Sequence, residues 1–159
     1  MITENKGEQQ SCLTPYETRI SVDALIFDGS YVFRSNSDGY HSLEFVPFTS
    51  YDHQRLAELI ENCKTLVYQR SGYYSQKNIR TCVERKNGIY VATQIFRPVV
   101  DPIPPYEVFD DCQHASLELY LNDDPSGEIY LNCSYINLYS PNNGIDEDYV
   151  SEREPDIDF

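Results

Sequence analysis

The sequence predicts one α+β domain, a small barrel or curved sheet of mostly antiparallel strands with a single helix. The 159 residues suffice for one domain with a hydrophobic core and are too few for two. Several short runs alternate apolar and polar residues between turn sequences, whereas helical spacing of apolar residues occurs in one place. We expect the domain to cover residues 15–140, between a mobile N-terminus at 1–14 and a disordered acidic tail at 141–159.

Three strands are predicted in the first third of the domain. Asp28-Gly29-Ser30 and the segment 36–39 (Asn-Ser-Asp-Gly) consist of residues typical of turns. The runs of β-branched and aromatic residues around these turns indicate strands at 19–27, 31–35 and 40–48. Together they predict a meander of three consecutive strands.

The helix is predicted to follow Thr49. Its apolar positions repeat at i, i+3, i+4 and i+7, which places them on one face of a helix. These positions are Leu56, Leu59, Ile60 and Cys63. Ser50 or Asp52 is expected to cap the first turn. The segment 65–69 (TLVYQ) is interpreted as a short strand beyond the helix.

Two hairpins are predicted in the second half of the chain. Asn87-Gly88 is a strong signal for a two-residue turn, and Asp-Asp-Pro-Ser-Gly at 123–127 is a second turn sequence. The flanking strands are 79–86 and 89–96 for the first hairpin, and 116–121 and 128–139 for the second. The order of strands and helix, with the last hairpin added, favours an OB-like small barrel.

Charge is distributed unevenly along the chain. The formal net charge is −14, yet residues 64–97 hold seven lysines and arginines and a single carboxylate, with tyrosines interspersed. Cations neutralise phosphates and aromatic rings stack on unpaired bases, so this combination is typical of single-stranded nucleic-acid binding. A solvated hairpin face remains the alternative explanation. The candidate nucleic-acid-binding residues are Arg70, Tyr73, Tyr74, Lys77, Arg80, Arg85, Lys86 and Tyr90.

A two-residue turn also predicts which face each residue of the first hairpin occupies. Arg85 and Tyr90 would lie opposite one another on the outer face. Ile89, Val91 and Ile95 would then face the core. We therefore expect the Tyr90 ring to be exposed.

The last eight residues read EREPDIDF. This segment resembles the acidic, phenylalanine-terminated C-terminal tip of single-stranded DNA-binding proteins from bacteria and T7-type phages, and the match is limited to the tail. The resemblance implies an OB fold that coats single strands. It also implies a tip that docks replication and repair enzymes and competes with DNA for a basic groove. The partner-binding residues that it implies are Asp156, Ile157, Asp158 and Phe159.

These observations predict a single-stranded DNA-binding protein of the replication, repair or recombination type, with replication or repair proteins as further partners. The alternative is an acidic nucleic-acid mimic of the anti-restriction, anti-CRISPR or immunity type, which inhibits a nucleic-acid-processing enzyme. In that protein the carboxylates of the tail and the pairs Asp110-Asp111 and Asp123-Asp124 would imitate phosphates. The net charge favours the inhibitor, whereas the basic hairpin and the tail favour DNA binding.

No enzyme, cofactor or metal is predicted. The chain has neither a phosphate-cradling glycine loop nor a nucleophile elbow. Potential metal ligands gather only at 110–114, without a second well-spaced pair. The five cysteines contain no C-x-x-C pair, which predicts free and mostly buried thiols. No run resembles a secretory signal or a membrane span, so we expect a cytoplasmic protein.

Overall fold

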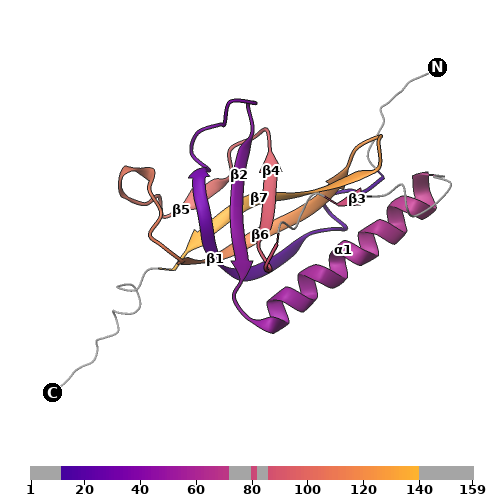
Figure 1. The fold of residues 1–159 in the computed structure, drawn as a ribbon, viewed down its shortest axis with the longest axis horizontal. Helices are drawn as coiled ribbons and strands as arrows, with labels where there is room; N and C mark the ends of the chain where they lie inside the picture. Colours follow the sequence, from indigo (N-terminus) through magenta and orange to yellow (C-terminus); the bar gives the residue numbers. More distant parts are fainter. Residues whose placement is uncertain (1–11, 72–79, 82–85, 140–159) are drawn as a thin grey trace.

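The computed structural model describes residues 12–71, 80–81 and 86–139. Within these residues the chain forms strands, one α-helix and a short 3₁₀ helix (Figure 1). The helices are α1 (Ser50–Ser71) and η3 (Pro105–Glu107). The strands are β1 (Ile20–Tyr31), β2 (His41–Pro47), β3 (Arg80–Thr81), β4 (Tyr90–Gln94), β5 (Val99–Asp101), β6 (Gln113–Asp123) and β7 (Glu128–Leu138).

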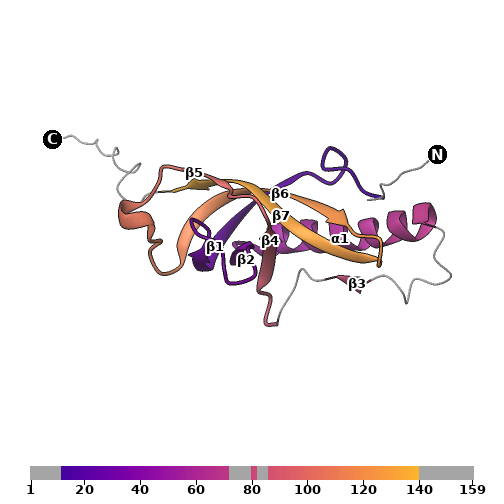
Figure 2. The ribbon, with the colours of Figure 1, turned by 90° about the horizontal axis from the view of Figure 1, so that it is seen from above.

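Five strands close into a barrel in the order β1-β2-β4-β7-β6, and β6 pairs with β1 to complete it. Neighbouring strands are antiparallel except β4 and β7, which are parallel. The short strands β3 and β5 pair with β7 outside this ring, and α1 packs against β1, β2 and β6 (Figures 1 and 2). The predicted OB-like barrel with one helix is confirmed.

The first strand is longer than predicted, and the strand predicted at 31–35 does not form. β1 runs through the predicted turn, and its register against β2 is irregular on both sides of Asp28. Asp28 Oδ1 accepts hydrogen bonds from the backbone N–H and the hydroxyl of Ser30, at 2.9 and 2.7 Å. A side chain at Gly29 would place its Cβ 2.4 Å from the Phe109 ring. The turn sequence therefore marks a bulge within one strand.

The helix begins where predicted but continues through the strand predicted at 65–69. The N-cap is Thr49 and not Ser50 or Asp52 as expected, because the Thr49 hydroxyl accepts from the Asp52 backbone N–H at 3.1 Å and donates to the Asp52 carboxylate at 2.7 Å. Val67 continues the buried stripe along α1, so burial outweighs the β propensity of this run. Among the described residues, no helix is long and apolar enough to cross a membrane.

The N-terminal segment contributes to the core. Leu13, which we expected in the mobile N-terminus, is 2% exposed. At the end of β6, Asp123 Oδ1 accepts hydrogen bonds from the backbone N–H groups of Cys12 and Leu13, at 2.7 and 3.0 Å. The Thr18 hydroxyl donates to the Leu121 carbonyl at 2.8 Å and accepts from the Leu121 N–H at 2.9 Å. These bonds attach the segment to the barrel wall.

Closure of the barrel depends on the side chain of Gln94. β4 and β7 share a backbone pair between Ala92 and Leu131. Beyond it, Gln94 Oε1 accepts from the Cys133 backbone N–H and Nε2 donates to the Cys133 carbonyl, both at 2.6 Å. Gln94 is 5% exposed, so water does not compete effectively for these groups. The amide thus extends the β4–β7 contact where the backbones no longer pair.

Both predicted turns form. Asn87 and Gly88 have φ angles of 60° and 78°, in the left-handed region that a type I′ turn requires. The first predicted hairpin, of strands 79–86 and 89–96, is wrong in its described part, because β3 pairs with β7 whereas β4 pairs with β2 and β7. Residues 82–85 lie outside the described part of the chain. The second hairpin is confirmed, because β6 and β7 pair antiparallel around the turn at 123–127.

The described cysteines are free, as expected; they are Cys12, Cys63, Cys112 and Cys133. Two of them are buried and Cys112 is exposed. Burial raises the pKa of Cys63 to about 11 and that of Cys133 to about 12, so both thiols stay protonated at neutral pH.

We predict that Gln94→Leu destabilises the fold by roughly 2–4 kcal/mol, because it leaves the N–H and C=O of Cys133 without partners in the barrel wall. Urea unfolding followed by circular dichroism measures the change. The control is Gln54→Leu on the exposed face of α1, for which we expect a change within about 0.5 kcal/mol. Equal stability of the two variants would contradict the role of the amide.

Candidate nucleic-acid interface

The structure describes some of the predicted nucleic-acid-binding residues. Arg70 lies in the last turn of α1, Lys86 is exposed in the turn before β4, and Tyr90 begins β4. The backbone of Arg80 lies in β3. The remaining candidates lie outside the described residues; they are Tyr73, Tyr74, Lys77, Arg85 and the tail residues Asp156, Ile157, Asp158 and Phe159.

Arg70 holds the N-terminal segment against the helix. Its guanidinium Nη1 donates to Glu17 Oε2 at 2.6 Å and to the Cys12 carbonyl at 3.0 Å. The hydrogen bond to Arg70 lowers the pKa of Glu17, and the same bond raises the pKa of Arg70. The positive charge of Arg70 is therefore largely matched within the chain.

The prediction that the Tyr90 ring is exposed is wrong. Tyr90 is 2% exposed and stacks against Phe45, with ring centroids 5.9 Å apart. Its register partner in β2 is Phe45, and both side chains point into the barrel. The alternation of β4 is thus opposite to the prediction, and Ile95 is 74% exposed. The run has apolar residues on both faces, so its sequence does not decide which face is buried.

The outer face of β1, β2 and β4 carries an aromatic ring beside a cation at one end. Tyr31, Ser42 and Thr93 lie in one row across the three strands. The Tyr31 ring is 39% exposed, and the Arg34 guanidinium lies 5.5 Å from its centroid. Tyr40, which precedes β2, is 41% exposed. We call Tyr31, Arg34 and Tyr40 the Tyr31 cluster.

Sequence reasoning missed the Tyr31 cluster because it assigned residues 31–35 to a strand. In the structure Tyr31 ends β1 and residues 32–35 begin the loop between β1 and β2, where the backbone carbonyl of Asn36 accepts from Gly39 N–H at 3.0 Å. The signal that could have found the cluster is a Tyr and an Arg three residues apart beside a polar turn sequence.

The next row on the same face is acidic. Asp28 and Glu44 are register partners in β1 and β2, and Val91 is the partner of Glu44 in β4. A phosphate backbone is repelled by carboxylates and attracted by arginine. The Tyr31 cluster is therefore the end of this face that suits a polyanion.

No group of three or more metal-ligating side chains occurs in the described ranges. The run at 110–114 that holds several such residue types is spread over a loop and the start of β6. Tyr106, Glu107 and Cys112 in and near this loop have left-handed φ angles of 59°, 58° and 53°.

The fold is similar to that of a protein whose structure has been solved. It matches two structures of the single-stranded DNA-binding protein from bacteriophage Enc34, one of them a C-terminal truncation. The truncated form has a TM-score of 0.55 and 10% sequence identity, over 78% of this chain and 87% of that chain. The other has a TM-score of 0.53 and 9% identity, over 82% and 91%. At such low sequence identity, the likeness shows that the two proteins share a fold and nothing further.

Comparison by sequence gives no relative. No protein-family model matches the chain, and no curated protein matches it. Function is therefore inferred from the fold and from the side chains of the outer face.

Since Tyr90 is a core residue, we predict that Tyr90→Ala destabilises the protein by roughly 3–5 kcal/mol. Removal of the ring that stacks on Phe45 leaves a cavity inside the barrel. Thermal and urea unfolding measure the loss. Tyr16→Ala, at a ring that is 88% exposed, is the control and should change stability by less than about 0.5 kcal/mol. A Tyr90→Ala protein as stable as the control would contradict the inward orientation.

Proposed function

We propose that this chain is a single-stranded DNA-binding protein rather than an enzyme. The observation that carries the proposal is the closed OB-like barrel with an exposed Tyr31–Arg34 pair on its outer face. The phage Enc34 protein that shares this fold is a single-stranded DNA-binding protein. OB folds commonly bind oligonucleotides on the second and third barrel strands and the adjoining loops, which here are β2, β4 and the loop that contains Arg34.

The proposed binding mode combines stacking with charge neutralisation. Tyr31 and Tyr40 offer ring faces to unpaired bases, and Arg34 neutralises a phosphate beside them. Lys86, exposed before β4, provides a cation at the far end of the strand pair. The proposal adds to this surface the residues of the basic segment predicted from sequence other than Arg70, whose charge is matched by Glu17; they are Tyr73, Tyr74, Lys77, Arg80 and Arg85.

The proposal assigns protein partners to the tail. Asp156, Ile157, Asp158 and Phe159 dock replication or repair proteins, with the phenylalanine ring in an apolar pocket and the carboxylates against basic residues. The tail also competes with DNA for the cations of the body, since seven of its side chains are carboxylates and one is an arginine. The cytoplasm is the expected compartment.

The second candidate function, inhibition by nucleic-acid mimicry, is favoured by the exposed pair Asp110-Asp111. The other pair named from sequence has structural roles. Asp123 binds the N-terminal backbone, and Asp124 Oδ1 accepts from the backbone N–H groups of Ser126 and Glu128, at 3.0 and 3.1 Å. Of the two pairs, the first is therefore the one suited to imitate phosphates.

Fluorescence anisotropy of labelled oligo-dT tests the proposal directly. The full chain and a version truncated after Ser140 are titrated at low and moderate salt. We expect binding that weakens with salt and that tightens when the tail is removed, because the competitor is then absent. No binding by either version at low salt would refute DNA binding and leave the inhibitor as the function to pursue.

Two substitutions test the Tyr31 cluster. Tyr31→Ala should weaken oligo-dT binding about tenfold, since stacking contributes ~1–3 kcal/mol per base. Arg34→Gln should also weaken binding and reduce the slope of log K against log salt by about 0.7. The matched controls are Tyr16→Ala and Arg19→Gln, at exposed residues before β1, at its opposite end from Tyr31. Equal losses in the cluster variants and the controls would contradict this surface.

A further inference from the structure

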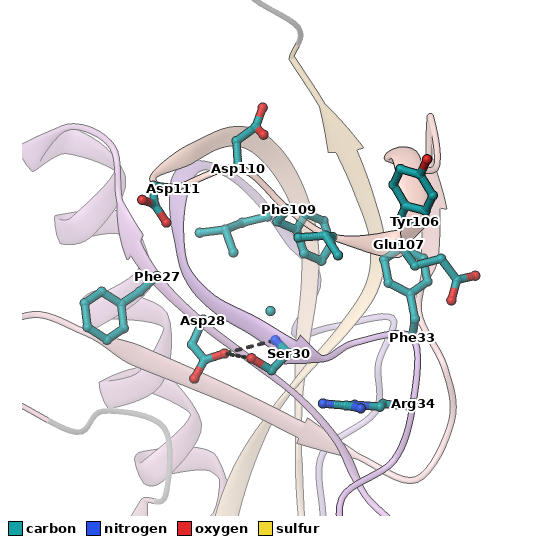
Figure 3. A pocket seen from close by; sticks show the side chains of 13 residues that line it. Phe27, Asp28, Ser30, Phe33, Arg34, Tyr106, Glu107, Phe109, Asp110 and Asp111 are labelled. Carbon is teal, nitrogen blue, oxygen red and sulfur yellow. Dashed lines mark hydrogen bonds between the residues drawn. The ribbon is translucent and has the colours of Figure 1, made fainter.

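A pocket of about 500 Å³ lies between the end of β1, the loop after it and the segment that precedes β6 (Figure 3). Phe33 and Phe109 form its apolar wall and stack with ring centroids 5.5 Å apart. Gly29 leaves room for the Phe109 ring. The pocket is thus built by residues far apart in sequence.

The rim of this pocket carries an aromatic ring that contacts little of the protein. Tyr106 is 96% exposed, and its backbone is in the left-handed region. The next residue, Glu107, binds Arg97 through an ion pair of 3.0 Å. Arg97 in turn lies 5.0 Å from the centroid of the Phe33 ring. Arg97 therefore joins the segment that contains Tyr106 to the loop that follows β1.

The charged side chains that line the pocket favour a cationic ligand. Its lining includes one arginine, Arg34, and four carboxylates, which belong to Asp28, Glu107, Asp110 and Asp111. Figure 3 shows Asp110 and Asp111 on the side of the pocket away from Arg34. A polyanion such as DNA would be repelled there. The chain's own acidic tail has the wrong sign for the same reason.

Contacts of the kind that such a rim would make with arginine already occur within this protein. Arg34, Arg55 and Arg97 each lie over an aromatic ring, at 5.5, 5.4 and 5.0 Å from its centroid. Arg97 combines the ring contact with a carboxylate, Glu107. Arginine suits both contacts because its planar guanidinium stacks on rings and pairs with carboxylates through two parallel N–H groups.

From this geometry we infer that the pocket is a docking site for an arginine-bearing segment of another protein. One arginine of the partner stacks on the Tyr106 ring and a second pairs with Asp110 or Asp111, which lie on the other side of the pocket in Figure 3, while the partner's backbone follows the rim. This contact adjoins the proposed DNA-binding surface at Arg34, which lines the pocket and also lies over the Tyr31 ring, but it uses other side chains of the pocket. It gives the acidic body of the protein a partner-binding role of its own.

The test is an NMR titration of the ¹⁵N-labelled full chain with the peptide Gly-Arg-Gly-Arg-Gly and, as a control, Gly-Gln-Gly-Gln-Gly. We expect saturable shifts of the amide signals of Ser30 and of residues 106–111 with the arginine peptide alone. Oligo-dT in a parallel titration should shift the amide signal of Arg34, which lies over Tyr31 and also lines the pocket, and leave those of Asp110 and Asp111 unchanged. Shifts of Asp110 and Asp111 by oligo-dT, or equal shifts by both peptides, would overturn the inference.

Variants make the same test quantitative. The double variant Asp110→Asn/Asp111→Asn should bind the arginine peptide with about fivefold lower affinity. Tyr106→Ala should lower the affinity by a similar factor. The control Glu58→Gln/Glu61→Gln removes the same charge from the exposed face of α1 and should bind as the unmodified protein does. Equal weakening in both double variants would mean that net charge alone is responsible and would refute a specific pocket. The spectra also show that each variant is folded.

Discussion

The bidentate contact of the Gln94 amide with the backbone of Cys133 is the interaction on which the rest of the structure depends. β4 and β7 run parallel, and their backbones pair over a short stretch, so this side chain completes the seam that makes the sheet a closed barrel. Closure gives the sheet an inside, where Phe45 and Tyr90 stack, and an outside, where Tyr31 lies beside Ser42 and Thr93. Without the seam, the outer face would have no fixed curvature to offer a nucleic-acid strand.

The two sides of the barrel have different tasks. On one side, α1, the N-terminal segment and the turn between β6 and β7 are tied together by Arg70 and Asp123 (Figures 1 and 2). On the other side, the loops after β1 and β5 carry exposed aromatic rings, the short helix η3 and the residues that line the pocket. The residues that stabilise the fold are thus separate from those to which we assign binding.

The elements that sequence alone predicted correctly are those determined by residues close together in the chain. The Asn87-Gly88 turn, the β6–β7 hairpin and the start of α1 depend on residues close together in the chain, and all three form. Long-range contacts decided the rest. The Phe109 ring against Gly29 accompanies the bulge that keeps β1 continuous, and the partner Phe45 turns Tyr90 inward. The Tyr31 cluster was missed for the same reason, because its place beside β2 follows from that bulge.

Photo-crosslinking with an oligo-dT that contains 5-iodo-deoxyuridine tests the central claim most directly, because the iodinated base crosslinks to the aromatic ring on which it stacks. An oligonucleotide of roughly ten residues fits the ~4–16-nucleotide site of one OB fold. The account predicts crosslinks at Tyr31 or Tyr40, located by mass spectrometry of the digested complex. Crosslinks confined to the tyrosines of β6 and β7, which are Tyr120, Tyr130 and Tyr135, or a lack of crosslinks under conditions of saturating binding, would contradict it.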